Sequence, residues 1–348
     1  MQHDPIDASL VDFGVLADWM DDRALPGGAF ETVERLGGGT QNILVRFRRG
    51  DREYVLRRPP AHLRAKSNDA LRREARVLAA LDGTGVRAPR LIAACTDEDV
   101  MGGAVFYLME SVHGFNPTTT LPRTHAGDPA TRHRMGLEAA AALAELGAVD
   151  HVAVGLGDLG RPEGFLERQV GRWLSELESY NALAGYPGPD IPGLLDVAEW
   201  LEAGRPRDWQ PGIMHGDYHL ANLLYSFDGP EVAAIVDGEM CTIGDPLLDL
   251  GWLVATWPDE EDVPLSGAIA QAGGLPSTAE LVEVYGAGSG RDLSALTWYT
   301  VLACFKLGIV LEGTHARAFA GKAPKDVGDL LHATTLGLFA RARTFMEA

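Results

Sequence analysis

The apolar pattern of the chain changes near Gly114, and this change limits the folds that the sequence can adopt. Before Gly114, the runs ILVRF, EYVLR, RLIAAC and AVFYLMESV are rich in β-branched and aromatic residues and are separated by turn-forming stretches. The segment 67–85 has helical periodicity instead, and its apolar stripe comprises Leu71, Ala75, Leu78 and Leu81. Asn68 or Asp69 is the expected cap of this helix. Residues 1–112 therefore predict a small antiparallel sheet with one packed helix.

Residues 113–348 are mainly helical in character. Length and periodicity predict helices over 132–146, 163–180, 194–204, 292–318 and 327–348. Two stretches with short β-like runs, 212–226 and 231–240, interrupt this helical pattern. The sequence thus predicts an α+β protein with a first domain at 1–112 and a second, helical domain at 113–348.

The composition limits the class of protein. Apolar residues make up 46% of the 348 residues, which is typical of a globular chain with a sizeable core. The acidic start lacks the basic and apolar regions of a signal peptide, and no apolar run reaches the ~20 residues needed to span a bilayer. Cys95, Cys241 and Cys304 are scattered, which argues against a disulfide framework. We therefore expect a cytoplasmic protein that does not bind membranes.

Charge is distributed unevenly along the chain. Residues 1–113 contain 15 Lys and Arg against 17 Asp and Glu, whereas the remainder contains 15 against 32. A nearly balanced, Arg-rich first third can approach phosphates, but the acidic remainder would repel nucleic acid. The charge pattern therefore argues against a nucleic-acid partner, and solubility alone is the other explanation for it. The oligomeric state cannot be predicted from the sequence.

The stretch HGDYHLANLL, at 215–224, concentrates polar groups in one short segment. His215, Asp217 and His219 are possible zinc ligands, but their spacing differs from the HExxH pattern of zinc enzymes. A polar loop without chemistry is a second interpretation. The third is a catalytic loop, in which Asp217 is followed five residues later by Asn222.

A second acidic motif supports the catalytic interpretation. Fifteen residues after Asn222, the apolar run AAIV delivers Asp237 into a turn at Gly238. Phosphoryl transfer needs a carboxylate that receives the proton of the attacking hydroxyl and oxygen ligands that hold Mg²⁺ on the nucleotide. The Asp-x-x-x-x-Asn pair followed by Asp-Gly matches, in spacing and order, the catalytic and metal-binding signatures of protein kinases.

The sequence resembles the aminoglycoside phosphotransferase family of small-molecule kinases. HGDYHLANLL and TIGDPLLDLGWL carry this resemblance, and it extends over nearly the whole chain through RLGGGTQNILVRF, REARVLAAL and YLMESVHG. RQVGRW and WYTVLACFKLGIVLEG are more similar to the kinase-like domains fused to acyl-CoA dehydrogenases. The resemblance implies a protein-kinase-like bilobal fold, with a small β-sheet lobe and a larger helical lobe.

The resemblance also implies roles for single residues of the second lobe. Asp217 would be the catalytic base, and Asn222 and Asp237 would be Mg²⁺ ligands. The supporting residues would be His215, His219, Glu239 and Asp249: the histidines as structural side chains, Glu239 as a possible second carboxylate near the metal, and Asp249 as an acceptor for backbone donors of the catalytic loop. Asp245 is either a helix cap or a site residue.

The first lobe is expected to bind the nucleotide. The cofactor-binding residues implied by the resemblance are Gly37, Gly38, Gly39, Thr40, Asn42, Arg57, Glu74, Glu110 and Val112. The glycines would let backbone amides approach phosphates, although a glycine cluster before a strand is also an ordinary turn. Glu74 should pair with a cation on EYVLRR, where Arg57 stands at the position of the usual lysine and Arg58 is an alternative.

Lys306 is a lone cation within an apolar helix. Such a side chain either extends to solvent along the helix surface or faces a cleft, and we expect the first. If it faces a cleft, it would meet an anionic group of the substrate.

The sequence as a whole predicts an ATP- and Mg²⁺-dependent kinase that phosphorylates a hydroxyl group of a small molecule, with GTP as an alternative donor. The resemblance favours a hydroxyacyl-CoA-like metabolite. The alternatives are an aminoglycoside, which the acidic second lobe would attract, and a nucleotide-binding scaffold without activity.

Overall fold

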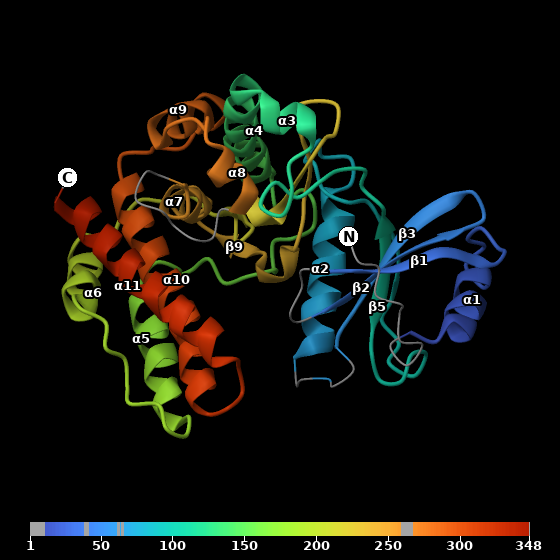
Figure 1. Cartoon of the computed structure of the whole chain (residues 1–348), viewed down its shortest axis with the longest axis horizontal. Coiled ribbons are helices and arrows are strands. Elements are labelled where there is room, and N and C mark those ends of the chain that lie inside the picture. Colours follow the sequence, from blue (N-terminus) through green and yellow to red (C-terminus); the bar gives the residue numbers. More distant parts are fainter. Residues whose placement is uncertain (1–10, 38–41, 61–62, 64–65, 259–266, 348) are drawn as a thin grey trace. The chain divides into compact units, whose positions relative to one another are not determined.

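The computed structural model describes residues 11–37, 42–60, 63, 66–258 and 267–347. Contacts group the chain into two units (Figure 1). The first, here called the sheet unit, comprises Met1–Gly114 and Ala233–Glu239. The second, the helical unit, comprises Phe115–Val232 and Met240–Ala348. Residues 233–239, which the sequence pattern places in the second domain, therefore group with the first.

Five antiparallel strands form the sheet of the first unit, in the order β1-β2-β3-β5-β4. The strands are β1 (Phe30–Leu36), β2 (Ile43–Arg49), β3 (Arg52–Arg58), β4 (Leu91–Cys95) and β5 (Phe106–Glu110). Four of them were predicted. The sequence did not predict β1 as a strand of its own, because this edge strand is largely exposed and its pairing is interrupted by an irregularity between Glu31 and Glu34.

Each face of the sheet is covered by one helix (Figure 1). Helix α1 (Phe13–Asp21) packs on the face that carries Leu56 and Leu108, and α2 (Ser67–Leu81) packs on the face that carries Val55 and Tyr107. Successive side chains of a strand point to opposite faces. Arg57 therefore lies on the same face as Val55, toward α2.

Local capping differs from the sequence prediction at both helices. Asp12 caps α1, which the sequence did not predict, and its Oδ1 accepts the amides of Gly14 and Val15 at 3.0 Å. The expected cap of α2 by Asn68 or Asp69 was wrong, because the N-cap is Lys66 and makes no side-chain cap bond. Asn68 instead accepts the amide of Val105, so a tertiary contact takes its side chain.

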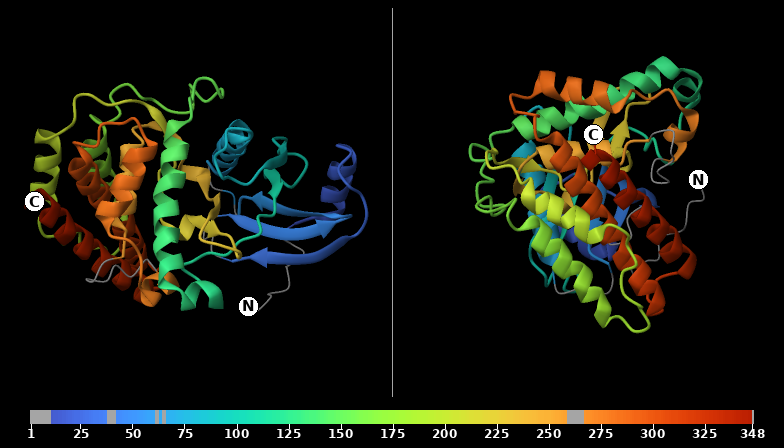
Figure 2. Two further views of the ribbon diagram at one scale, coloured as in Figure 1. Left: turned by 90° about the horizontal axis from the view of Figure 1, so that it is seen from above. Right: turned by 90° about the vertical axis from the view of Figure 1, so that its left-hand side faces the viewer.

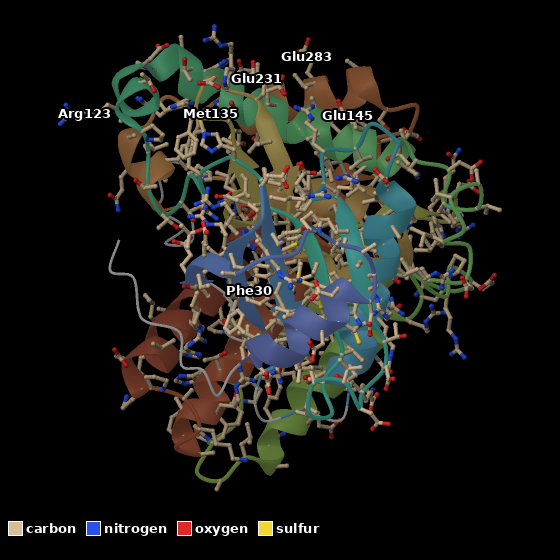
Figure 3. All side chains as sticks on the ribbon, turned by 90° about the vertical axis from the view of Figure 1, so that its right-hand side faces the viewer. Phe30, Arg123, Met135, Glu145, Glu231 and Glu283 are labelled. Carbon is tan, nitrogen blue, oxygen red and sulfur yellow. The ribbon has the colours of Figure 1, made fainter. Side chains whose placement is uncertain are left out.

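Aromatic contacts join α1 to the edge of the sheet. The rings of Phe13 and Phe30 lie edge-to-face with centroids 5.0 Å apart. The ring of Phe30, which is labelled in Figure 3, also lies edge-to-face with that of Phe47, at 5.1 Å between centroids. Such pairs add to the stability that area burial alone provides. The short α1 thus extends the core of the sheet unit beyond what strand pattern alone indicates.

The helical unit contains the larger share of helices. These are α3 (Arg123–Gly127), α4 (Pro129–Ala148), α5 (Gln169–Ser179), α6 (Leu194–Ala203), α7 (Leu247–Ala255), α8 (Gly267–Ala272), α9 (Thr278–Gly288), α10 (Leu296–Phe319) and α11 (Lys325–Glu347). The predicted helices correspond to α4, α5, α6, α10 and α11, although α5 begins six residues later than expected. The α+β class predicted from the sequence is confirmed.

Short strands position the loops of the helical unit. Strand β6 (Gly212–Met214) pairs antiparallel with β9 (Thr242–Gly244), and β7 (Leu223–Tyr225) follows the polar loop. Strand β8 (Val232–Ile235) begins after a turn in which the Ser226 amide donates to the Glu231 carbonyl. The β-like stretches predicted around 212–226 and 231–240 are thus three short strands separated by irregular segments.

Helix α10 is the central element of the helical unit. It runs beside α11 in both views of Figure 2 and also contacts α5, α6 and α7. It is long and apolar enough to span a bilayer, but 78% of its most apolar stretch is buried inside the protein, as in the core helix of a folded domain. At Gly251 of α7 an added Cβ would lie 2.6 Å from the Tyr299 carbonyl carbon, so glycine permits this close approach of α7 to α10.

Truncation of Leu56 tests the packing of the sheet unit. Leu56 is fully buried against α1, and we expect Leu56→Ala to lower the unfolding free energy of this unit by about 2–5 kcal/mol. Hydrogen exchange of the β3 and β5 amides measures this loss. Leu63→Ala is the control, because Leu63 is 41% exposed and should lose less than about 1 kcal/mol. Equal losses in the two variants would contradict the assignment of this core.

Candidate functional site

The loop that carries Asp217 begins directly after β6. Gly216 has φ +84°, a conformation that side chains rarely adopt, and an added Cβ would lie 2.7 Å from the Met240 carbonyl oxygen. Glycine therefore lets the chain turn sharply past Met240 and present Asp217. This explains why the motif has glycine between His215 and Asp217.

A buried carboxylate holds the start of this loop. Asp249 of α7 accepts the His215 amide at 2.6 Å on Oδ2 and the Gly216 amide at 2.9 Å on Oδ1, which are the backbone contacts expected from the sequence. Burial raises the pKa of Asp249, and its contacts with His215 and Gly216 together with the charge of Lys306 oppose this rise. Because the side chain is 1% exposed, these donors satisfy groups that would otherwise be costly to bury.

Lys306 of α10 holds the other side of the same residue, Gly216. Its ammonium donates to the Gly216 carbonyl at 2.8 Å and lies 4.4 Å from the centroid of the Trp252 ring and 5.6 Å from that of Trp173. The expectation that Lys306 extends to solvent was wrong, since the residue is 6% exposed. A carbonyl acceptor and two aromatic faces stabilise the cation inside the protein, so the apolar helix can carry it.

Asp217 is fixed by two neighbours from its own loop. Asn222 Nδ2 donates to Asp217 Oδ2 at 3.1 Å and to its carbonyl at 2.9 Å, and His219 Nε2 lies 3.3 Å from Asp217 Oδ1. The Ala221 amide donates to His219 Nδ1, so the neutral ring carries its proton on Nε2 and donates it to Asp217. The amide oxygen of Asn222 remains available for another partner.

These contacts set the ionisation of Asp217. Burial alone would raise its pKa, but the hydrogen bond from His219, followed by the contributions of His215 and Lys306, lowers it to about 2. Asp217 is therefore a carboxylate at neutral pH. Each of its oxygens accepts one bond and keeps a further lone pair, so the group can still accept a proton or a hydroxyl hydrogen bond.

Aromatic residues anchor the loop to α4. Tyr218 is fully buried, and its hydroxyl donates to the Ala139 carbonyl at 2.7 Å, while the Tyr225 hydroxyl donates to the Met135 carbonyl at 2.9 Å. The His215 ring meets Tyr218 edge-on at 5.8 Å and is 2% exposed. His215 is thus part of the packed support of the loop, as the sequence suggested.

In the sheet unit, Arg57 gathers three carboxylates. Its Nε lies 3.0 Å from Glu74 Oε2, and its Nη2 lies 2.5 Å from Asp237 Oδ1 and 3.4 Å from Glu239 Oε2. Asn42 Nδ2 also donates to Glu239 at 3.0 Å. The parity of β3 places Arg57, rather than Arg58, on the α2 face, so Arg57 forms the ion pair with Glu74 that the sequence predicted for this strand.

Burial and charge oppose each other in this cluster. Burial would lower the pKa of Arg57, but Glu74, Tyr107 and Asp237 raise it overall, so the guanidinium keeps its charge. Burial raises the pKa of Glu74 to about 7 even though Arg57 lowers it. Three carboxylates around one guanidinium leave an excess of negative charge. A bound cation would relieve that excess.

The backbone turns sharply at Asp237. It has φ +67°, which is uncommon for a residue other than glycine, and its side chain is 38% exposed. The Ile235 amide donates to the Arg87 carbonyl at 2.7 Å, which fixes the strand that delivers Asp237. Strained backbone held in this way is common at functional sites.

The structure says less about the remaining residues that were expected to bind the nucleotide. Gly38, Gly39 and Thr40 lie outside the described residues, and Gly37 follows β1 with open space around it. Glu110 is exposed, with its carboxylate 3.8 Å from Arg90 Nε, and Val112 is half-buried after β5. The contacts bring Arg57, Glu74 and Asn42 together with the acidic turn, but they do not join Glu110 or Val112 to them.

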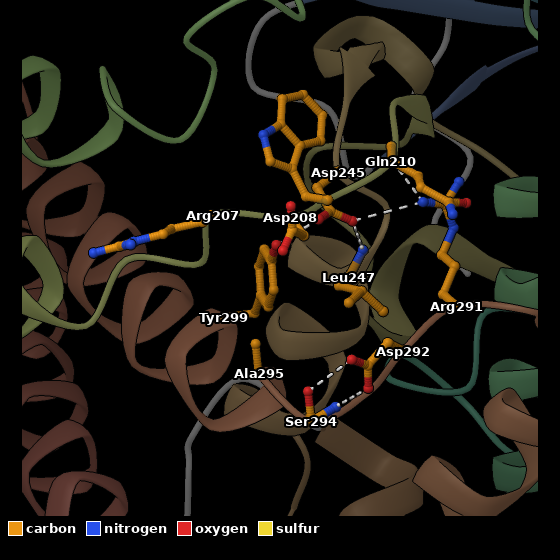
Figure 4. A pocket seen from close by; sticks show the side chains of 11 residues that line it. Arg207, Asp208, Gln210, Asp245, Leu247, Arg291, Asp292, Ser294, Ala295 and Tyr299 are labelled. Atoms are coloured by element: carbon orange, nitrogen blue, oxygen red, sulfur yellow. Dashed lines mark hydrogen bonds and ion pairs between the residues drawn. The ribbon is translucent and has the colours of Figure 1, made fainter.

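The side chain of Asp245 contacts the start of α7 and a tyrosine of α10. Its Oδ1 accepts the Leu247 amide at the start of α7, and Tyr299 donates to its Oδ2. It also lines a cavity of about 410 Å³ together with Arg291, Asp208 and Trp209 (Figure 4). Asp245 thus contacts the first turn of α7 from the position before the N-cap, which is Pro246.

Sequence reasoning missed the contact of Lys306 with the loop that carries Asp217 and that of Asn42 with Glu239. Both contacts join residues that are far apart in the chain, by 90 and 197 positions. A charged residue within an otherwise apolar helix was the signal available for Lys306. The asparagine after the glycine cluster carried no comparable signal.

Comparisons with known proteins give a consistent family. Residues 32–285 match the profile of the phosphotransferase enzyme family. The chain is 30% identical over 297 residues to the human protein acyl-CoA dehydrogenase family member 11, covering 83% of this chain and 37% of that protein. The chain thus spans less than half the length of this relative.

Solved structures agree with this result. A putative aminoglycoside phosphotransferase from Ralstonia eutropha has a TM-score of 0.78 and 28% identity, with 96% of this chain and 98% of that chain covered. The GDP complex of aminoglycoside 2′-phosphotransferase-IIIa has a TM-score of 0.60 and 16% identity, with 93% and 98% covered, and therefore supports the fold alone. The predicted kinase-like fold and the family resemblance are confirmed.

The ionisation of Lys306 gives a pH-dependent prediction. Burial lowers its pKa from 10.5 to about 8, although Asp249 and Asp217 oppose this. Below pH 8 the folded protein bears the cost of a buried charge, whereas from pH 8 to 10.5 only the unfolded chain keeps the proton, so rising pH favours folding. Over this range we expect the free energy of unfolding of the wild type to rise by up to about 3 kcal/mol relative to that of Lys306→Met. Denaturant unfolding at a series of pH values measures it.

The exposed Lys322 provides the matched control for this experiment. The difference between wild type and Lys322→Met should stay constant over the same pH range. A wild-type-minus-Lys306→Met difference that is equally constant would show that the lysine keeps an ordinary pKa.

Proposed function

Because the chain belongs to the phosphotransferase enzyme family, whose profile covers residues 32–285, we propose that it transfers the γ-phosphoryl group of ATP to a hydroxyl group of a small molecule. The observation that carries this proposal is the geometry of the loop at Asp217. A single ionised carboxylate is held there by His219 and Asn222, with a free lone pair on each oxygen. This is the arrangement required of a base that orients a hydroxyl for attack.

Asp217 acts as the base in this proposal. The acceptor oxygen attacks the γ-phosphorus, the bond from that phosphorus to the bridging oxygen breaks, and Asp217 takes the hydroxyl proton. A carboxylate with a pKa of about 2 is a weak base, so its main contribution is orientation, and proton transfer occurs late. Positioning supplies most of the rate enhancement when the transition state is loose.

Asn222 and Asp237 are the proposed metal ligands. The Asn222 amide nitrogen is turned toward Asp217, which leaves its oxygen as the ligand atom, and one Asp237 oxygen remains beside the one that Arg57 holds. Carboxylate and amide oxygens are the ligands that Mg²⁺ prefers. The bound Mg²⁺ would neutralise phosphate charge, while Glu239 adds a further carboxylate through the shared contact with Arg57.

Arg57 is the proposed phosphate-binding cation of the sheet unit. Glu74 fixes its guanidinium from α2, and the fork of an arginine can hold a carboxylate and a phosphate at once. We assign the phosphates to the segment 37–42 and the adenine to 109–112. GTP is the alternative donor.

For the acceptor we favour a hydroxyacyl-CoA thioester or a similar hydroxylated metabolite. The similarity to the human protein acyl-CoA dehydrogenase family member 11 supports this choice. An aminoglycoside is the second candidate, supported by the Ralstonia structure and by the acidic residues after position 113. A nucleotide-binding protein without transfer activity is the third, because arginine replaces the usual lysine at position 57.

Substitution of Asp217 tests the proposed chemistry. Asp217→Asn should lower phosphoryl transfer at least about 100-fold, because the base is lost, and it should leave the thermal shift caused by Mg·ATP largely unchanged. Asp228→Asn, at an exposed turn of the same unit, is the matched control and should keep full activity. Transfer that survives in Asp217→Asn would exclude Asp217 as the base.

An acceptor screen separates the three candidate functions. We expect hydroxyacyl-CoA thioesters to stimulate ADP release and to yield a phosphorylated product by ³¹P NMR, with little stimulation by aminoglycosides. The reverse result would favour the antibiotic kinase. Mg²⁺-dependent ATP binding without stimulation by any hydroxylated compound would favour the scaffold.

A further inference from the structure

Three metal-ligating side chains meet where α10 and α11 pack together, away from the Asp217 loop in sequence. Glu312 and His315 are three residues apart on α10 and therefore share one helix face, and His332 faces them from α11. One ligand atom from each side chain lies within 4.8 Å of the other two. The two helices run side by side in Figure 2. The proposed function uses none of these residues.

Glu312 is a buried charge with ordered partners. It is fully buried, and the Tyr186 hydroxyl donates to its Oε1 at 2.7 Å while His332 Nδ1 lies 2.7 Å from its Oε2. Each carboxylate oxygen thus accepts one bond and keeps a second lone pair. A buried carboxylate is costly unless it is paired or coordinates a metal, so this environment suits a cation.

The two histidines differ in how they would bind an ion. His315 Nδ1 lies 3.1 Å from the Gly328 carbonyl, which can only accept, so this nitrogen carries the proton and the neutral ring keeps its lone pair on Nε2. Metal-binding histidines usually donate their other nitrogen to a carbonyl or a carboxylate, as His315 does here. His332 Nδ1 instead faces Glu312 of the same cluster, so a metal ion bound by these two side chains would take the place of the proton that they share.

The rings of the two histidines pack against each other. The imidazoles of His315 and His332 are stacked, with centroids 4.3 Å apart and planes inclined by 18°. The side chains are 12% and 22% exposed, which leaves a path for an ion and room for water as a further ligand.

We propose that Glu312, His315 and His332 bind a divalent transition-metal ion, and that Zn²⁺ is the ion best suited to two imidazoles and one carboxylate. Zinc sites with three protein ligands of this kind keep a further position for water. Mg²⁺ prefers oxygen ligands and would not compete well. The bound ion would link α10 to α11 and stabilise the helical unit against unfolding.

Metal retention tests this proposal directly. The full chain is freed of metal with a chelator, equilibrated with Zn²⁺ in excess Mg²⁺, passed through a desalting column and analysed by elemental mass spectrometry. We expect about one Zn²⁺ per chain, a rise in melting temperature with Zn²⁺, and at least a tenfold weaker affinity in His315→Ala/His332→Ala. Chelator treatment should return wild type to the melting temperature of its metal-free form.

A surface His–Glu pair supplies the control. His133 Nε2 lies 2.9 Å from Glu280 Oε1, and His133→Ala should retain Zn²⁺ as wild type does. Circular dichroism of His315→Ala/His332→Ala without metal shows whether it folds; if it does not, the single variants replace it. Substoichiometric Zn²⁺ in wild type, or equal retention by a folded double variant, would overturn the proposal. A Co²⁺ complex with the visible absorption of nitrogen-ligated tetrahedral cobalt, absent from the variant, would support it.

Discussion

The candidate active loop depends on how the Gly216 peptide is held. Asp249 accepts its amide, Lys306 donates to its carbonyl, and the close approach to Met240 excludes any side chain at this position. Gly216, Asp249 and Lys306 are buried, so each hydrogen bond acts without competition from water. Asp217 follows this fixed peptide directly. The position of the carboxylate therefore depends on α7 and α10, two elements of the helical core, as well as on His219 and Asn222 of its own loop.

The same logic explains the unusual composition of α10. A helix that contacts α5, α6, α7 and α11 must be apolar almost all round, yet it also carries Lys306 and Glu312. Both charges are buried, and each has specific partners: Gly216 and two tryptophans for Lys306, and Tyr186 with His332 for Glu312. Buried charges of this kind cost stability unless they are compensated. We infer that α10 carries them because of what they position.

Sequence predicted the parts of the site that depend on local spacing. Asp217 and Asn222 are five residues apart, so their contact follows from one short loop. The position of Asp237 directly after an apolar strand could be predicted equally well. The burial of Lys306 could not be predicted, because its partner lies 90 residues away and a lysine on an apolar helix ordinarily extends to solvent. Asn68 failed as a cap for a similar reason, since a tertiary contact with Val105 uses its side chain. The exposed strand β1 and the short α1 lacked the periodicity on which such predictions rest.

In the proposed mechanism, Asp217 remains free to act as the base while the side-chain oxygen of Asn222 binds the metal ion. A crystal structure with Mn²⁺ and a non-hydrolysable ATP analogue tests this most directly. We expect Mn²⁺ to be bound to Asn222 Oδ1 and to a carboxylate oxygen of Asp237, while the Asp217 oxygens still accept hydrogen bonds from Asn222 and His219. Mn²⁺ bound by Asp217 itself, or a nucleotide complex in which Asn222 does not touch the metal, would contradict it.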